Sequence, residues 1–367
     1  APPPWPSGRW AKWLGGRLAN LPRFHAIDLE VPLLVGLAAG LIYFRWLGGD
    51  PKLKAALAVA LCAVWVGRPI CFALCISAVI GAMTWFYEET SRVEYRLRSF
   101  YGVLKVTQDE DPPINYLSHG HIRHGAQFRD ENPKVHDQPL IYYHRLGPIG
   151  QAFAALDDRL KGCKLAMVGL GVGSLAAYGQ SGQQLTFFEI DPDVERIARD
   201  ERYFTFLRDC PAEVRVVLGD ARIKLAETDA TYAMIVVDAF SGDAVPVHLL
   251  TREALELYRS KLAPGGVIAF HISNSYLRLA PVLGNLADAA GLVALAQNDA
   301  FFSPASDPDT LGKSPSHWVL IAADAADFGP LARDRRWRRL ARDRRVALWT
   351  DDFSNLLEVF EWPRIPQ

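Results

Sequence analysis

The segment that most constrains this fold is "AMVGLGVGSLAAYGQSGQQLTFFEID", residues 166–191. An apolar run breaks into alternate glycines, Gly169, Gly171 and Gly173, resumes as small residues and returns as a second apolar run that ends in Glu189. This is the outline of a β-α-β unit whose glycine-rich turn lets the backbone approach a ligand closely. The segment therefore predicts a nucleotide-binding sheet.

The chain after Gly147 continues the same alternation of strand and helix signals. Strands are expected at "KLAMVGL", "QLTFFEI", "VRVVLGD", "YAMIVVDAF" and "GGVIAFHIS", and helices at "SLAAYGQ", "DVERIARD" and "REALELYRSKL". This alternation predicts the α/β class, with a doubly wound and mostly parallel sheet in residues 147–367. Residues 91–146 consist instead of short strand and turn signals, which predict a small β-domain before the sheet.

The first part of the chain has the composition of a membrane segment. Residues 1–30 interleave tryptophan with basic residues and proline, which fits either a membrane interface or a disordered leader. Three apolar runs follow, residues 31–47, 55–66 and 70–87. The third run carries no charge and ends in "WFY", which suits a membrane interface. We expect transmembrane or membrane-embedded helices in residues 31–90, with a buried hairpin as the alternative. The basic leader favours a cytoplasmic N-terminus, and an even number of spans would keep the catalytic domain in the cytoplasm.

Composition restricts the classes of partner. Lys and Arg number 40 against 41 Asp and Glu, so the net charge gives no reason to expect a nucleic-acid partner. The five cysteines form no CxxC pair or disulfide framework, and structural zinc is not expected. The run "RDRRWRRLARDRR", residues 333–345, is interrupted by two aspartates and is expected to form a solvated helix.

Three histidines lie close together at His119, His121 and His124. Their spacing does not by itself match a metal site, and roles in a substrate pocket or in the structure are favoured. No metal is predicted for this chain.

Acidic residues follow successive predicted strands, where a doubly wound sheet binds its ligands. Glu189 ends the second strand, and its carboxylate can accept hydrogen bonds from both ribose hydroxyls. Asp220 and Ala221 follow the third and suit an adenine edge, with a carboxylate for the exocyclic amine and an N–H for a ring nitrogen. Asp238 ends the fourth. Each acid alone could be a helix cap or turn former, but together they predict a nucleoside site.

NAD and S-adenosylmethionine both fit glycines followed by a ribose-binding acid. The motif here lacks the third glycine of the dinucleotide fingerprint at its usual spacing. The aspartate after the third strand also has a natural adenine role. Both features favour S-adenosylmethionine or a relative of it.

Several segments together resemble one known family. They are "SFYGVLKV", "LSHGHIRHGAQ", "PLIYYHRLGPIGQA", "VVDAFSGDAVPVHLLT" and "TDDFSNLL", which with the nucleoside site extend from residue 95 to about 360. They resemble the spermidine synthase (polyamine aminopropyltransferase) family, and more closely its membrane-fused bacterial branch. The resemblance implies a small N-terminal β-domain on a Rossmann-like class I methyltransferase-type sheet, a homodimer, and a place in the bacterial inner membrane. It also implies an alkyl transferase that moves an aminopropyl group from decarboxylated S-adenosylmethionine to an amine and releases methylthioadenosine.

The resemblance also assigns roles to residues. Asp238 would orient and deprotonate the attacking amine, since an amine must be neutral and aligned to attack the carbon beside a sulfonium. Tyr143 and His144 would contact the substrate, and Asp243 would lie in the loop that closes over it. The residues that would hold the donor are Gly169, Gly171, Gly173, Glu189, Asp220 and Ala221.

Departures from the family pattern leave the donor open. The family's loop has an Asp that holds the amino group of the decarboxylated donor, and Val172 stands there in this chain. The family's β-domain Gln aligns with Arg123, which could pair with the carboxylate of intact S-adenosylmethionine or be a surface residue. Gln127 is a further candidate for substrate binding. The polyamine-binding carboxylates are incompletely reproduced, and "TDDFSNLL" could bring Asp351 or Asp352 to the pocket or the dimer interface.

Three alternatives to aminopropyl transfer follow from these departures. Intact S-adenosylmethionine could be cyclised or cleaved, or could donate its aminocarboxypropyl group, to an amine or with no second substrate. The protein could be a methyltransferase, which would release S-adenosylhomocysteine. It could also be a non-catalytic nucleoside sensor coupled to the membrane segment.

Overall fold

The computed structural model describes residues 30–32, 34–35, 38, 60, 62–89, 92–120, 122–130, 132–239, 246–274, 276–299 and 310–361; of residues 82–89 and 133–134 it describes the backbone alone. The chain divides into two compact units, Ala1–Arg92 and Val93–Gln367. The boundary lies close to the predicted end of the apolar region at residue 90. The predicted divisions at residues 30 and 146 fall inside these units and stay predictions.

In the first unit, helix α4 (Pro69–Glu89) coincides with the third apolar run. It begins at a proline, whose missing N–H has no helical partner to lose at that position. Cys71, Cys75 and Val79 of this helix are buried against Val35 and Cys62. Within the part of the chain that the structure describes, no helix is both long enough and apolar enough to cross a membrane. The first two apolar runs lie largely outside the described residues, and the membrane helices stay a prediction.

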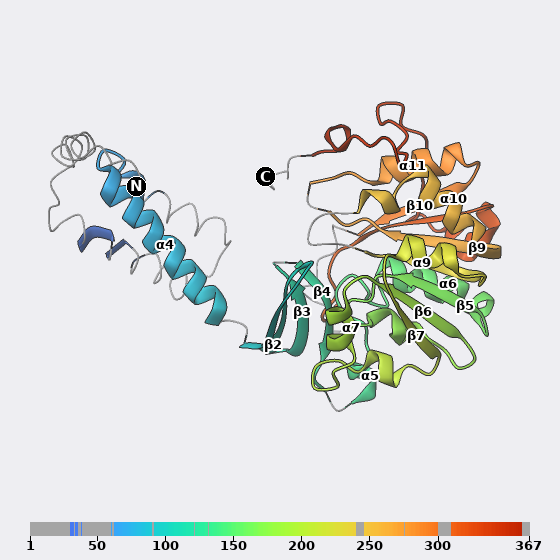
Figure 1. The fold of residues 1–367 in the computed structure, drawn as a ribbon, viewed down its shortest axis with the longest axis horizontal. Coiled ribbons are helices and arrows are strands. Elements are labelled where there is room, and N and C mark those ends of the chain that lie inside the picture. Colours follow the sequence, from blue (N-terminus) through green and yellow to red (C-terminus); the bar gives the residue numbers. More distant parts are fainter. Residues whose placement is uncertain are drawn as a thin grey trace, which may run out of the picture. The chain divides into compact units, whose positions relative to one another are not determined.

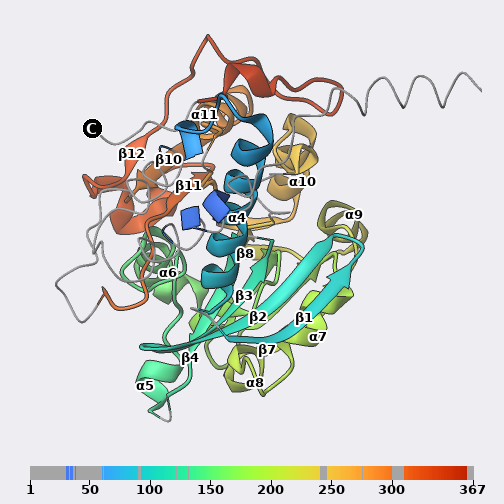
Figure 2. The ribbon, with the colours of Figure 1, turned by 90° about the vertical axis from the view of Figure 1, so that its left-hand side faces the viewer.

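The second unit begins with the predicted small β-domain. Four antiparallel strands form it in the order β1-β2-β3-β4, and they lie side by side in Figure 2. Their bounds are β1 Arg92–Ser99, β2 Gly102–Glu110, β3 Pro113–His119 and β4 Ile122–Phe128. The segment "SFYGVLKV" therefore contains a turn between two strands, in which the Tyr101 N–H donates to Ser99 Oγ at 3.1 Å.

The large sheet has eight strands in the order β12-β10-β11-β9-β8-β5-β6-β7 (Figure 1). Strands β7, β6, β5, β8 and β9 are parallel, whereas β11 runs antiparallel to β9 and to β10. The bounds are β5 Lys164–Val168, β6 Gln184–Glu189, β7 Glu213–Leu218, β8 Tyr232–Val237, β9 Leu262–His271, β10 Val293–Asn298, β11 His317–Ala322 and β12 Arg338–Arg339. The predicted Rossmann-like, methyltransferase-type sheet is confirmed, and its order reverses between β5 and β8.

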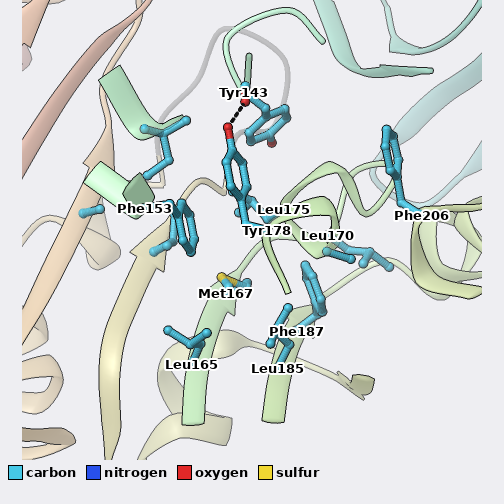
Figure 3. Packing of buried hydrophobic residues seen from close by; sticks show 14 of the residues in the cluster. Tyr143, Phe153, Leu165, Met167, Leu170, Leu175, Tyr178, Leu185, Phe187 and Phe206 are labelled. Carbon is cyan, nitrogen blue, oxygen red and sulfur yellow. Dashed lines mark hydrogen bonds between the residues drawn. The ribbon is translucent and has the colours of Figure 1, made fainter. Parts of the chain in front are cut away.

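Side chains of the parallel strands alternate between two buried clusters, because successive residues of a strand point to opposite faces. Leu165 and Met167 of β5 belong to a cluster that also includes Phe153 and several residues of the β-domain (Figure 3). Ala166 and Val168 belong to the cluster on the other face. The helices are α5 Pro133–His136, α6 Pro148–Leu160, α7 Pro192–Ala198, α8 Phe206–Asp209, α9 Ala221–Glu227, α10 Arg252–Ser260 and α11 Ala280–Ala289, with 3₁₀ helices η2 Ser174–Tyr178, η3 Val247–Leu249, η5 Ala325–Arg333 and η6 Leu356–Glu358.

Two sequence expectations about local structure are wrong. The helix expected at "SLAAYGQ" is the short 3₁₀ helix η2, which ends at Gly179. A Cβ on Gly179 would lie 2.5 Å from Cys210 Sγ, so only glycine lets the chain pass this close to Cys210. The hydroxyl of Tyr178, the last residue of η2, donates to the Tyr143 carbonyl (Figure 3).

The arginine-rich segment is a pair of turns around β12 rather than a solvated helix. The side chain of Asp334 accepts from the Arg336 N–H at 2.9 Å, and that of Asp343 accepts from the Arg345 N–H at 3.0 Å. Such local side-chain bonds compete with helix formation. Trp337 is buried between the two turns.

Candidate active site

Asp238 lies directly beside the glycine loop at the point where the strand order reverses. It follows β8, and its N–H donates to the carbonyl of Val168 at the end of β5, at 2.8 Å. Gly169 has φ +99°, and a Cβ there would lie 2.2 Å from the Asp238 carbonyl oxygen. Only glycine allows this approach. The predicted neighbours therefore meet at the carboxyl ends of β5 and β8.

Two side chains hold the buried Asp238 carboxylate. The Tyr143 hydroxyl donates to Oδ2, and His271 Nδ1 lies 2.8 Å from Oδ1. Burial, reinforced by the Asp238 charge, raises the pKa of Tyr143 well above its ordinary value, so its hydroxyl keeps its proton. A carboxylate has about four acceptor positions, so both oxygens can still accept from a substrate.

His271 was not predicted as a functional residue. It ends β9, and its ring stacks between the rings of Tyr142 and Trp318, at centroid distances of 4.4 and 4.7 Å. Its Nε2 lies 2.7 Å from Ser273 Oγ. The sequence carried the signal, since "GGVIAFHIS" is a strand that ends in a polar residue, like the four strands whose ends were singled out.

The residues that the sequence predicts to hold the nucleoside lie at the ends of β6 and β7. Glu189 Oε2 accepts from the Leu170 N–H at 3.0 Å, and Oε1 accepts from the Asp191 N–H at 2.9 Å. Burial raises the pKa of Glu189, and these amide donors oppose that shift. The carboxylate is thereby fixed against the glycine loop.

Asp220 combines a structural contact with its predicted position. Its Oδ1 caps α9 by accepting from the Ile223 N–H at 3.1 Å, and its Oδ2 lies 3.2 Å from His248 Nε2. The helix-cap interpretation is therefore correct. Asp220 and Ala221 nevertheless lie in the same pocket wall as Glu189.

These residues line one open pocket, which encloses about 920 Å³ including its mouth. Its sheet side carries the carboxylates, and its β-domain side is aromatic and apolar apart from two histidines. The β-domain residues are Tyr101, Leu104, Leu117, His119 and His124. Burial lowers the pKa of His124 to about 4, so its ring is neutral at pH 7. Its Nε2 is buried and has no hydrogen-bond partner among the described residues.

Two residues that the family alignment brings to the donor position lie outside this wall. Val172 is fully buried and packs against Gly125 of β4, where a Cβ would lie 2.3 Å from Val172 Cγ2. The guanidinium of Arg123 lies 3.8 Å from the centre of the Tyr116 ring, away from the pocket lining. Arg123 and His124 are adjacent on a strand and so face opposite sides, and His124 is the one that lines the pocket.

His144 and Gln127 also have structural contacts rather than places in the pocket wall. His144 Nδ1 accepts from the Leu146 N–H at 3.2 Å within a turn. Burial, with Lys313 and Arg145 nearby, lowers the pKa of His144 to about 4. The Gln127 side chain donates to Thr205 Oγ1 at 3.0 Å and accepts from the Thr205 N–H at 2.8 Å. It ties the β-domain to the start of α8.

The remaining candidates lie in four different places. Gly171 lines the pocket and has φ +54°. A Cβ on Gly171 would lie 2.4 Å from the His124 carbonyl oxygen, so no larger residue fits there. Gly173 packs instead against Leu207. Asp351 pairs with Arg222 at 2.6 Å, away from the pocket. Asp243 and His121 lie outside the described residues.

Among the described residues, one cluster has ligand atoms close enough to share a metal ion, His136, Asp137 and Asp209. His136 Nδ1 already lies 2.9 Å from the Phe128 carbonyl and Nε2 lies 2.7 Å from Thr205 Oγ1. Both ring nitrogens are thus engaged in the fold. This cluster is separate from the pocket that contains Asp238.

Comparisons with known proteins show what the chain as a whole is similar to. No family model matches the chain. A polyamine aminopropyltransferase from Vibrio vulnificus is 37% identical over 114 residues, which cover 29% of this chain and 36% of that protein. The chain is spermidine-synthase-like. A probable polyamine aminopropyl transferase from Bifidobacterium longum is 26% identical over 204 residues, which cover 54% of this chain and 41% of that protein.

The similarity extends to solved structures. A probable spermidine synthase from Corynebacterium glutamicum superposes with a TM-score of 0.48 and 18% identity, covering 68% of this spermidine-synthase-like chain and 90% of that one. The chain spans about two fifths of the length of each of the two curated relatives. Their activity therefore comes to this chain as a proposal.

Proposed function

We propose that this protein transfers the propyl-side group of an S-adenosylmethionine-type donor to an amine. The nitrogen lone pair of the amine attacks the propyl carbon next to the sulfonium. The carbon–sulfur bond breaks and its electron pair stays on sulfur, which leaves neutral methylthioadenosine. The amine must shed a proton to attack, and Asp238 accepts it as the general base.

The observation that supports this most is the position of Asp238. Its carboxylate shares one pocket with Glu189, Asp220 and Ala221, at the switch point where a doubly wound sheet binds its ligand. An ammonium group must lose a proton before its nitrogen can attack a carbon next to a sulfonium. Asp238, held by two side chains, is suited to orient and deprotonate such an amine.

The charges of the pocket favour the decarboxylated donor. Among the described residues that line the pocket, four are Asp or Glu and none is Lys or Arg. A donor that kept its carboxylate would bury that charge without a cationic partner, which is costly. The amino group of the decarboxylated donor is a cation and is attracted to the acidic side.

Val172 supports the second candidate, a reaction of intact S-adenosylmethionine. Its apolar side chain is turned into the core, so this loop position has no carboxylate that would repel the carboxylate of the intact donor. The intact donor would yield methylthioadenosine by cyclisation, cleavage or aminocarboxypropyl transfer. The two candidates differ in the donor and share the site.

The experiment that tests the proposal is an assay of purified protein with each donor, with and without putrescine or a simple monoamine. Mass spectrometry identifies the nucleoside released. Methylthioadenosine from the decarboxylated donor with an amine supports the proposal, and the same product from the intact donor supports the second candidate. S-adenosylhomocysteine as the product, or no product from either donor, would contradict both.

Membrane attachment through residues 31–90, with the catalytic domain in the cytoplasm, and a homodimeric state are further proposals from the sequence and its resemblance. Fractionation of cells that express the full chain tests the first. Light scattering of the purified protein in detergent tests the second.

A further inference from the structure

We propose that His271 is a positioning residue for Asp238, acting through a hydrogen bond from its Nδ1 that fixes the carboxylate for the attacking amine. This inference rests on the proposed function for its kinetic consequence. The geometry behind it is independent of that function.

Both ring nitrogens of His271 lie within hydrogen-bond distance of a side-chain oxygen. An ionised carboxylate only accepts, so the proton of the 2.8 Å bond to Asp238 is on His271 Nδ1. His271 Nε2 lies 2.7 Å from Ser273 Oγ, which also accepts from the His317 N–H at 2.9 Å. A hydroxyl has one proton and two lone pairs, so Ser273 can bond to Nε2 in either direction. The proton on Nδ1 is therefore assigned from the carboxylate of Asp238, and Ser273 holds the other end of the ring.

The imidazole ring of His271 is also held by aromatic packing. Its planes face Tyr142 and Trp318, at interplanar angles of 24° and 25°. The side chains of His271 and Asp238 are 4% and 3% exposed. The ring can neither tilt nor exchange its bond for water, so the orientation of the carboxylate is fixed before substrate binds. Preorganisation of this kind contributes to rate because a misplacement of about 1 Å can cost about 100-fold.

His271 and Tyr143 together hold the Asp238 carboxylate. Tyr143 holds one carboxylate oxygen and His271 the other, from different elements of the fold. With one donor removed, the carboxylate can rotate about its last bond and present the wrong lone pair to the amine. Removal of the His271 donor is therefore expected to lower kcat while leaving the nucleoside contacts at Glu189 intact.

The test compares two neutral amides of similar size. His271→Asn places an N–H near the position of Nδ1, whereas His271→Gln places one near Nε2, toward Ser273. We expect His271→Asn to keep kcat within about tenfold, and His271→Gln to lose about 100-fold or more. The dissociation constant of methylthioadenosine, measured by calorimetry, should be unchanged in both variants. Equal loss in both, or loss that follows weaker nucleoside binding, would overturn the inference.

A spectroscopic readout separates this inference from the proposed function. An imidazole N–H bonded to a buried carboxylate gives a far-downfield proton resonance in the NMR spectrum, which should vanish in His271→Gln and in Asp238→Asn. If the resonance is present but wild type turns over no donor, the proposed function fails and the geometric inference stands. If wild type is active and the resonance is absent, the inference alone is wrong.

Discussion

Val172 of the glycine loop packs directly against Gly125 of the β-domain, so that a Cβ on Gly125 would lie 2.3 Å from Val172 Cγ2. The loop residue that the family uses to hold a donor is here part of the contact between two sheets. Val172 is completely buried, and the apolar cluster that includes it also contains residues of β2 to β4. The contact therefore connects the donor loop to the small domain that forms the other pocket wall.

This contact predicts compensation between two substitutions. Gly125→Ala should lower the free energy of unfolding by about 1–3 kcal/mol, because the added methyl group overpacks the site. Val172→Ala should lower it by about 1 kcal/mol or more through the cavity it leaves. The cavity left by Val172→Ala can accept the methyl group added by Gly125→Ala. The double variant should therefore lose less free energy of unfolding than the sum of the two single losses. Urea denaturation of the four proteins measures the coupling, and strict additivity would show that the two side chains do not share this space.

Replacement of Val172 by the family's Asp should not create a binding position for the donor's amino group. Val172→Asp would bury a carboxylate where the structure offers an apolar wall, and we expect it to lower the free energy of unfolding by about 3 kcal/mol or more. Binding of the decarboxylated donor should not become tighter. Thermal denaturation and calorimetry check both statements. A stable Val172→Asp protein with tighter donor binding would mean that this side chain can turn into the pocket.

Asp238→Asn should separate catalysis from binding. An amide cannot accept from both Tyr143 and His271 and cannot take the proton of the amine, so kcat should fall by about 100-fold or more. The substitution leaves the proposed nucleoside position at Glu189 unchanged, so the affinity for methylthioadenosine should stay close to that of wild type. Activity at the wild-type level would remove Asp238 from the reaction.

The stability of the fold should decline in mild acid. Burial lowers the pKa values of His124, His144 and His317 to about 4. The unfolded chain takes up protons on these rings near pH 6.5, while the folded protein does not until near pH 4. The unfolded state therefore binds more protons in between, and stability should be complete above pH 6.5 and fall as the pH drops toward 4.

Melting temperatures measured from pH 7.5 to 4.5 test this dependence. His317→Gln, which removes one of the three rings, should make the decline shallower. A melting temperature that is constant over this range would contradict the assignment of three neutral buried histidines.

The sequence predicted the parallel part of the sheet well because its signals are local. Glycines, apolar runs and strand-end acids all lie within single β-α-β units, and the topology places them at one edge. The positions of Glu189, Asp220 and Asp238 follow from that rule. His271 follows from it as well, once the fifth strand is treated like the first four.

Contacts between domains could not be predicted in the same way. Whether Arg123 or His124 faces the pocket depends on the register of β4, and β3 and β4 shift register between Leu117 and Ser118. A shift by one residue exchanges the two faces of a strand. The burial of Val172 likewise depends on Gly125, which is distant in sequence. Alignment to a family motif placed Val172 at a donor-binding position and made Arg123 a candidate partner for a donor carboxylate. The packing of both side chains puts them outside the pocket wall.

The central claim is that the reacting carbon lies on the propyl side of the sulfonium. The most direct measurement uses purified protein, an amine acceptor and the donor carrying an isotope label on its S-methyl carbon. We predict that the label stays on methylthioadenosine and that none enters the alkylated amine. Label in the amine, with an unlabelled nucleoside product, would contradict the account and identify a methyltransferase.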